Sequence, residues 1–181
     1  MVIADLEKST CILPQGKRAA SRKVAVFRLA DQAYGLPLDV VQEILPMMWL
    51  SRPPGIPKAL AGFFDRGGVS IPVVRLAALF GLPEQPAKLY TPLIVLRCAD
   101  KPLALSVDEI QEIVSIQESQ IAPLQESFCF NDSAIGLAAC GQTTLVLLSH
   151  EGLLTKEEKS RIEQLAEIEQ ARLDRLREDC A

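Results

Sequence analysis

Two pairs of carboxylates are the first residues in this 181-residue chain whose spacing could serve chemistry. Asp39 lies four residues before Glu43, and Asp108 lies four residues before Glu112. Two carboxylates held close together can act as general acid and general base. However, both pairs occur in the same local sequence, which ends in Gln-Glu-Ile. The repetition favours a structural role, in which Asp39 and Asp108 cap a short helical turn or a tight bend.

Other reactive side chains are few and scattered. His150 is the single histidine, so the sequence argues against a metal site or a catalytic cluster built from histidines. Cys98 and Cys140 lie within apolar segments, as small core residues do. The other three cysteines have no obvious activating neighbour: Cys11, Cys129 and Cys180. The motifs GxxxxGK[ST], GxGxxG and GxSxG are missing. The sequence therefore predicts a protein that is not an enzyme and that uses no metal and no cofactor.

The elements that position these residues occur twice in the chain, as an internal sequence repeat. Residues 24–45 align without a gap to residues 93–114, at an offset of 69. Each copy has an apolar run, a polar turn and a second apolar run, which is the pattern of a β-hairpin. The identical pairs are Val26/Val95, Arg28/Arg97, Ala30/Ala99, Asp31/Asp100, Leu36/Leu105, Asp39/Asp108, Gln42/Gln111, Glu43/Glu112 and Ile44/Ile113.

The similarity continues downstream at an offset of 74, where residues 61–64 with Gly67 align with 135–138 and Gly141. An apolar strand and a short helix-like segment follow in each copy. In the first copy, residues 65–68 (DRGG) predict a hairpin turn, residues 75–80 a short helix that ends at Gly81, and residues 83–92 a linker. In the second copy, the polar residues 115–133 predict a long connection between sheets.

Composition narrows the class of protein. Hydrophobic residues make up 49% of the chain, as in folded globular proteins. The net charge of −4 and the aromatic content of 5% argue against a nucleic-acid partner. The pattern shows no signal peptide and no run of the roughly 20 apolar residues that insertion into a membrane requires. Five cysteines without CxxC spacing are typical of a reduced, cytoplasmic protein.

The two ends of the chain differ from its middle. Residues 1–22 have no clear pattern and predict a flexible tail, with a contact arm as the alternative because of its basic residues. Residues 156–181 predict an amphipathic helix that opens with a capping box at Thr155 and runs to about Glu178. Its apolar stripe packs on the protein itself or awaits a partner helix. The stripe consists of Ile162, Leu165, Ala166, Leu173 and Leu176.

The repeat predicts a mainly β protein made of two small units, at about 24–82 and about 91–150, followed by the C-terminal helix. Several of its motifs resemble those of CheW-like domains. They are FRLADQAYGLPLDVVQEIL near the start, the proline-rich segment 52–57 followed by Gly62, the strand 68–76 with Pro72, the turn 107–113 and the closing segment 147–155. The resemblance covers about residues 23–155.

The resemblance implies two SH3-like, five-stranded β barrels and a non-enzymatic adaptor. It implies coupling of the cytoplasmic tips of chemoreceptors to the regulatory domain of a CheA-type histidine kinase, in the cytoplasm beside membrane receptor arrays. The partner-binding residues that it implies are Val41, Glu43, Gly62, Asp65, Arg66, Gly67 and Gly68. For each of them a structural role is the alternative: core for Val41, a cap or solvated charge for Glu43, and turn geometry for the glycines.

Two departures from the family pattern bear on this expectation. The arginine of the family's Asn-Leu-Arg-Gly segment is one position early here, at Arg66, and Arg75 stands where an acidic residue is usual. A one-residue shift places a side chain on the other face of a strand. The departures suggest an adaptor of a different chemosensory system, one for surface motility or biofilm. The further alternatives are a stand-alone SH3-like peptide-binding module and an enzyme that uses a cysteine.

Overall fold

The structure is a computed structural model that describes residues 21–86, 88, 90–97, 101–124, 133–141 and 143–179. Residues 1–20 of the predicted tail lie outside this part. The elements in chain order are β1 (Ser21–Leu29), β2 (Gln32–Pro37), η1 (Leu38–Val40), β3 (Val41–Leu45), β4 (Leu60–Arg66), β5 (Val69–Arg75), α1 (Leu76–Leu79), β6 (Leu93–Leu96), β7 (Leu103–Ser106), β8 (Glu109–Gln117), η2 (Glu118–Gln120), β9 (Ile121–Ala122), β10 (Ala134–Cys140), β11 (Thr143–Leu148) and α2 (Lys156–Glu178).

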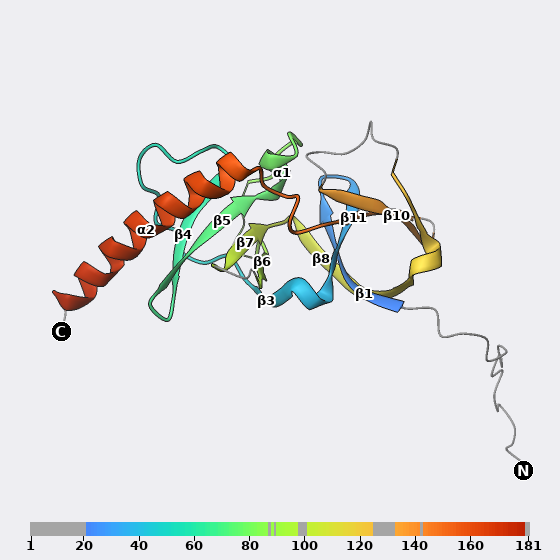
Figure 1. Ribbon diagram of the computed structural model, residues 1–181, viewed down its shortest axis with the longest axis horizontal. Helices are drawn as coiled ribbons and strands as arrows, with labels where there is room; N and C mark the ends of the chain where they lie inside the picture. The colour runs from blue at the N-terminus through green and yellow to red at the C-terminus, as the bar shows by residue number, and fades with distance from the viewer. Residues whose placement is uncertain are drawn as a thin grey trace, which may run out of the picture.

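The strands form two sheets that lie side by side in Figure 1, and together they confirm a mainly β fold with one long C-terminal helix. The six-stranded sheet has the order β8-β1-β2-β11-β10-β9, and the five-stranded sheet has the order β3-β6-β7-β5-β4. The hairpin β1–β2 belongs to the first sequence copy but completes the sheet of the second copy. The hairpin β6–β7 does the reverse. Each sheet is therefore built from both copies, which exchange their first hairpins.

The pairing register shows that the exchange obeys the sequence repeat. Val41 of β3 faces Leu96 of β6, and its equivalent Ile110 of β8 faces Phe27 of β1. Both pairings contain a bulge one step further along. In both sheets, the second strand of the exchanged hairpin runs parallel to a strand of the other copy, β2 to β11 and β7 to β5. The duplication inferred from the sequence is thus a structural one, residue for residue.

Each sheet curls around a small core of its own. In the five-stranded sheet, Phe64 of the edge strand β4 packs in one cluster with Leu93 and Val95 of β6, and Leu45 of the opposite edge strand β3 joins them. A flat sheet could not bring its two edges to one cluster, so the sheet closes as a small barrel. The six-stranded sheet encloses an equivalent cluster from β1, β8, β10 and β11, which includes Val26.

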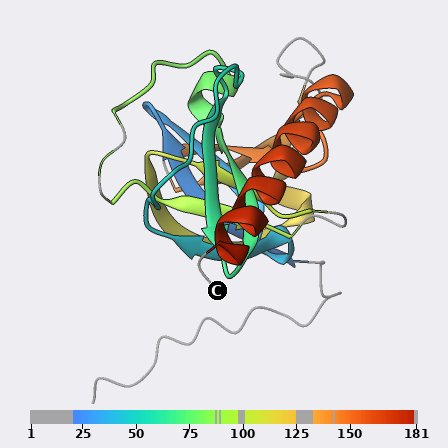
Figure 2. The same ribbon diagram turned by 90° about the vertical axis from the view of Figure 1, so that its left-hand side faces the viewer.

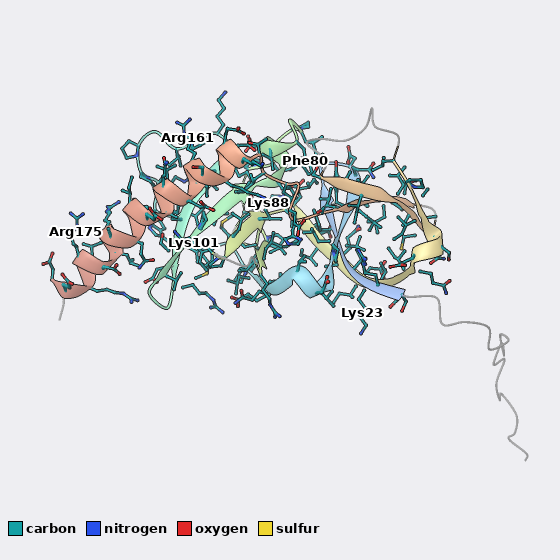
Figure 3. All side chains as sticks on the ribbon, in the orientation of Figure 1. Lys23, Phe80, Lys88, Lys101, Arg161 and Arg175 are labelled. Carbon is teal, nitrogen blue, oxygen red and sulfur yellow. The ribbon has the colours of Figure 1, made fainter. Side chains whose placement is uncertain are left out.

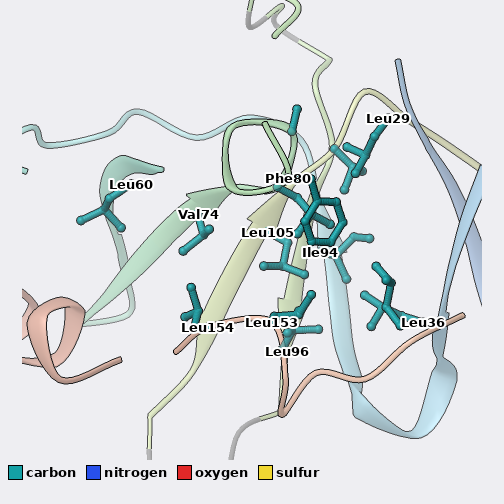
Figure 4. Close-up of a cluster of buried hydrophobic side chains, with 14 of the residues drawn as sticks. Leu29, Leu36, Leu60, Val74, Phe80, Ile94, Leu96, Leu105, Leu153 and Leu154 are labelled. Atoms are coloured by element: carbon teal, nitrogen blue, oxygen red, sulfur yellow. The ribbon is translucent and has the colours of Figure 1, made fainter. Parts of the chain in front are cut away.

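A third cluster joins the two sheets. It takes Leu36 from the six-stranded sheet and Ile94, Leu96 and Leu105 from the five-stranded sheet, as Figure 4 shows. Leu153, in the segment between β11 and α2, fills the space between them. Burial of such side chains stabilises a fold by about 1.5–3 kcal/mol each. The two barrels therefore share an interior and pack as one body.

Helix α2 crosses back from the end of the six-stranded sheet and packs on β5 and β4 of the five-stranded sheet (Figure 2). Its start confirms the predicted capping box, since the Thr155 hydroxyl accepts the Glu158 amide at 3.2 Å. Ile162 and Ala166 are buried in the shared cluster, so the predicted stripe packs on the protein itself at that end. Leu176 near the other end remains 55% exposed.

Two local predictions are wrong. Asp39 does not cap the short turn: it lies inside η1, whose N-cap is Pro37, without a side-chain cap bond. Asp108 also does not cap a turn of its own copy. Its Oδ2 accepts the amide of Ala30 at 2.7 Å, because hairpin exchange brings the β1–β2 turn of the other copy beside it. Ala30 itself has a positive φ, 51°, in that turn.

The predicted connection over residues 115–133 is wrong at its start. Strand β8 continues to Gln117, since its edge pairs with β1 as far as Ser21, and η2 and β9 follow it. Residues 125–132 of that connection lie outside the described part. The predicted short helix at 75–80 is confirmed as α1, and Gly81 follows it with a φ of 65°.

Candidate functional site

The partner-binding residues inferred from the sequence come from two separate strands that meet at one end of the five-stranded barrel. Val41 and Glu43 lie on the edge strand β3, and Arg66 ends the opposite edge strand β4. The Arg66 guanidinium donates two hydrogen bonds to the Glu43 carboxylate, and the bond from Nε to Oε1 measures 2.8 Å. This fork geometry is the strong form of an arginine–carboxylate pair. The pair therefore joins the two free edges of the sheet.

The exposure of this ion pair limits what it adds to stability. The Glu43 side chain is 23% exposed and the Arg66 side chain 48%. Pairs in such surroundings contribute about 0–1 kcal/mol because water and salt screen them. The displaced arginine of the family pattern is thus placed on an intramolecular carboxylate. The main effect of the Arg66–Glu43 pair is to fix the shape and charge of this end of the barrel.

The turn after Arg66 is a tight two-residue hairpin. Gly67 and Gly68 have φ values of 62° and 98°, the positive region in which glycine is favoured. Asp65 closes the turn, since its Oδ1 accepts the Gly68 amide at 2.6 Å. The DRGG segment is therefore the hairpin turn that the sequence predicts.

Helix α2 covers one side of this turn. Gln170 donates from Nε2 to the Gly68 carbonyl at 2.8 Å and accepts the Ser70 amide at Oε1, also at 2.8 Å. Arg177 lies 3.4 Å from Asp65 Oδ2. The side of the turn that faces α2 is thus occupied within the chain. The side that carries Arg66 and faces β3 remains exposed.

Gly62 does not join this surface. It is buried in β4, at a bulge opposite Val73, with a φ of 146°. A Cβ atom there would lie 2.5 Å from the Ser51 carbonyl oxygen. Ser51 and Phe63 exchange two backbone hydrogen bonds of 2.7 and 2.9 Å at this point. The structure therefore gives Gly62 the role of close backbone approach, which anchors the loop between β3 and β4.

That loop contributes to a groove that the sequence reasoning missed. The groove has a volume of about 1180 Å³ and runs from the β1–β2 turn, with Arg28, across to Arg75 of the five-stranded sheet. Trp49 and Tyr90 line it and are 93% and 83% exposed, and Met48 is 36% exposed. Large apolar side chains left this open to water mark sites of protein contact. The signal was the run Met47-Met48-Trp49 ahead of the prolines.

A buried carboxylate fixes the other end of the same loop. Glu169 of α2 is only 6% exposed, and its Oε2 accepts the Ser51 hydroxyl at 2.8 Å. Arg172 lies 3.6 Å from its Oε1. Sequence reasoning missed this contact because a glutamate beside a helix's apolar stripe reads as a solvated charge. Through Ser51, α2 holds the loop that carries Trp49.

Tyr34 and Lys101 have raised pKa values. Burial raises the pKa of the Tyr34 hydroxyl above 10.0. The hydrogen bond of 2.9 Å from Lys101, which lies beneath α2 in Figure 3, to Glu167 raises the pKa of that ammonium group. Within the ranges that the structure describes, no three His, Cys, Asp or Glu side chains are grouped as metal ligands would be. No helix in those ranges has the length and apolar character to span a membrane.

The fold and its surfaces define a class: a scaffold of two packed barrels that offers edges, a turn and an apolar groove to other proteins. The chain belongs to the CheW-like domain family, whose model matches residues 23–158. This confirms the resemblance seen in the sequence and the adaptor function in chemotaxis that it implied. Most of α2 lies beyond the matched range.

Individual relatives agree with this assignment. The chain is 27% identical over 143 residues to the chemotaxis protein CheW of Klebsiella aerogenes, covering 78% of this chain and 86% of that protein. It is 25% identical over 132 residues to the chemotaxis protein CheW of Helicobacter pylori, covering 72% and 80%. The fold matches the crystal structure of the scaffolding protein TtCheW from Thermoanaerobacter tengcongensis with a TM-score of 0.71 and 23% identity, covering 77% of this chain and 97% of that one.

Proposed function

We propose that this protein couples the cytoplasmic tip of a chemoreceptor to the regulatory domain of a CheA-type histidine kinase. It acts without catalysis, by holding both partners in the cytoplasm, and reaches the membrane only through the receptor array. The observation that carries the proposal is that one rigid body presents the same kind of barrel edge twice, with an apolar groove between. Two contacts on one body raise the local concentration of each partner, so modest affinities suffice for assembly.

The two edges carry the same residues in the same register. Ile44 on β3 is 42% exposed, and its equivalent Ile113 on β8 is 56% exposed. Glu43 faces Val95 on one edge, and Glu112 faces Val26 on the other. An exposed isoleucine beside a carboxylate gives each edge an apolar contact and a charge for orientation. Edge strands also offer free backbone groups to a docking partner.

We assign the first edge, together with the exposed side of the DRGG turn, to one partner. Glu43, Arg66 and Gly67 supply the accessible part of this surface, and the half-buried Val41 supports it. Asp65 and Gly68 face α2 in part and hold the turn in place. Gly62 supports the surface through the backbone and makes no contact of its own. The inter-sheet groove with Trp49 is the surface that we assign to the elongated receptor tip.

The test is direct binding of the full chain to two purified fragments from the same organism, a receptor cytoplasmic fragment and a kinase regulatory domain. We expect both to bind, and all three to elute together. Trp49→Ala should weaken receptor binding at least about tenfold and leave kinase binding within about twofold, since hot-spot aromatics carry much of an interface. Ile168→Ala, at another exposed apolar residue, on the outer part of α2, is the matched control.

The outcomes separate the alternatives. Binding to neither fragment would favour a stand-alone SH3-like peptide-binding module. Binding to both, with a deletion strain that swims normally but fails to spread on surfaces or to form biofilm, would identify an adaptor of a non-swimming chemosensory system. Binding to both with a loss of swimming chemotaxis would identify the swimming pathway.

A further inference from the structure

The internal symmetry gives both positions of the Arg66–Glu43 pair a counterpart in the other barrel. Glu43 faces Val95 across the β3–β6 pairing, and Glu112 faces Val26 across the β8–β1 pairing. Arg66 ends β4 opposite Val69, and the residue in the same place at the end of β10 is Cys140, opposite Thr143. The second barrel therefore keeps the carboxylate but lacks the arginine that grips it.

A hollow occupies the place where that arginine would lie. Its volume is about 570 Å³, and it opens between β8 and the β10–β11 hairpin. In the five-stranded barrel the Arg66 side chain spans the equivalent distance from β4 to Glu43 on β3. The hollow is lined by Val26, Arg28, Asp31, Ala33, Gln111, Glu112, Cys140, Thr143 and Leu145.

The chemistry of the lining suits a guanidinium on an aliphatic stem. Val26, Ala33 and Leu145, each at most 6% exposed, form an apolar floor over which the methylene groups of an arginine can lie. Glu112 supplies the carboxylate, and in the described part of the chain no basic side chain forms an ion pair with it. Arg28, the one cation in the lining, lies 3.7 Å from Asp31 and 3.9 Å from Glu109. The lining therefore carries one more negative than positive charge.

Arginine fits this site better than lysine. A guanidinium presents a planar fork that binds both oxygens of a carboxylate, as Arg66 binds Glu43, whereas an ammonium group is a point charge. The first barrel thus displays, within one chain, the geometry that an incoming arginine can adopt in the second.

We propose that the hollow beside Glu112 and Cys140 is a docking pocket for an arginine side chain of a partner protein, which binds Glu112 as Arg66 binds Glu43. The arginine enters along the free edge of β8. Only the identity of the partner, the kinase regulatory domain, rests on the function proposed above. The chemistry of the pocket rests on the symmetry.

The first experiment tests the pocket without any partner. The isotope-labelled full chain is titrated with a blocked Gly-Arg-Gly peptide and followed by amide chemical shifts. We expect saturable shifts at Glu112, Ile113, Cys140 and Thr143. The same peptide with citrulline, which has the shape of arginine but no charge, should bind about two- to fivefold more weakly and give correspondingly smaller shifts at equal concentration. Equal shifts with both peptides, shifts spread over other surfaces, or no saturable shifts would overturn the proposal.

The second experiment fills the pocket from within. Cys140→Arg places a guanidinium where the first barrel has Arg66, so it should abolish the peptide shifts, while Cys140→Ser keeps them as the matched control. Glu112→Gln keeps the pocket open and should reduce the affinity for the peptide about two- to fivefold. If Cys140→Arg fails to fold, as circular dichroism reports, Glu112→Gln alone decides, and unchanged affinity in that variant contradicts the proposal.

The same variants are then measured against the kinase regulatory domain. The parent chain should bind the kinase domain. If Glu112→Gln weakens this binding about two- to fivefold, Cys140→Arg weakens it at least as much and Cys140→Ser leaves it unchanged, the result supports both the pocket and the partner. No binding by the parent refutes the proposed partner, and the peptide titration still decides the pocket. Equal binding by all variants shows that the kinase does not use the pocket and overturns its assignment to this partner. A pocket filled by Arg66 of a second copy would instead show as dimerisation that Arg66→Ala removes.

Discussion

Replacement of Gly62 by alanine tests how the bulge in β4 anchors the loop that carries Trp49. The added Cβ would lie 2.5 Å from the Ser51 carbonyl oxygen, and the φ of 146° is one that side chains with a Cβ rarely adopt. The backbone strain costs about 1–2 kcal/mol. Moving Ser51 away gives up two hydrogen bonds with Phe63, worth about 1 kcal/mol each. We therefore expect Gly62→Ala to lower the free energy of unfolding by about 3–4 kcal/mol.

Gly67→Ala separates the two causes. Gly67 also has a positive φ, 62°, but a Cβ there meets nothing within 4 Å, so only backbone strain of about 1 kcal/mol is expected. Urea denaturation followed by far-UV circular dichroism measures both variants. Hydrogen exchange at the Ser51 and Phe63 amides should accelerate in Gly62→Ala alone. A Gly62 variant no less stable than the Gly67 variant, with both amides still protected, would refute the close-approach argument.

Three further predictions concern other contacts. Thr155→Ala should cost about 1 kcal/mol, because the hydroxyl that accepts the Glu158 amide is lost, and amide exchange in the first turn of α2 should rise; unchanged exchange would contradict the cap. Asp108→Ala should cost about 2 kcal/mol in chemical denaturation by stranding the Ala30 amide, and Asp108→Asn, which keeps an acceptor oxygen, should cost less. Burial raises the pKa of Tyr34, so its contribution to stability is present below pH 10.0 and is lost as the pH rises through the raised native pKa. Tyr34→Phe should flatten that loss between about pH 9 and about pH 11 in urea titrations, and an unaltered pH profile would argue against the burial effect.

The strands and their turns could be read from the sequence, because apolar alternation, Gly-rich turns and a capping box are local signals. The hairpin exchange could not. The two exchanged hairpins share residues such as Val26 and Val95, and each fits either sheet in the same register. The local sequence of each hairpin therefore favours the exchanged and the unexchanged arrangement equally. The choice depends on how the two barrels pack across Leu36, Ile94 and Leu105, which is a property of the whole fold.

The candidate site shows the same division. Val41, Glu43 and residues 65–68 were inferred from the resemblance to the family, and the turn at 65–68 could also be read from its glycines. That Arg66 reaches Glu43 depends on closure of the barrel, which brings together strands with no mutual register in the sequence. The burial of Glu169 depends on where α2 packs on the five-stranded sheet, and a charged residue type does not predict that position. The hollow beside Cys140 is formed by strands that are far apart in the sequence, so no local pattern could predict it.

The exchange of hairpins has a consequence for the origin of the chain. In a single copy, the first hairpin does not pair with the other strands of that copy, so its sheet lacks two strands. The sheet is complete only when a second copy contributes its own first hairpin. That is the arrangement of a two-fold, strand-swapped homodimer. Joining the two subunits end to end, through the residues between β5 and β6, yields the present topology. Once joined, the halves were free to diverge, and the difference between Arg66 and Cys140 at two equivalent sites is the kind of asymmetry that a symmetric homodimer could not possess.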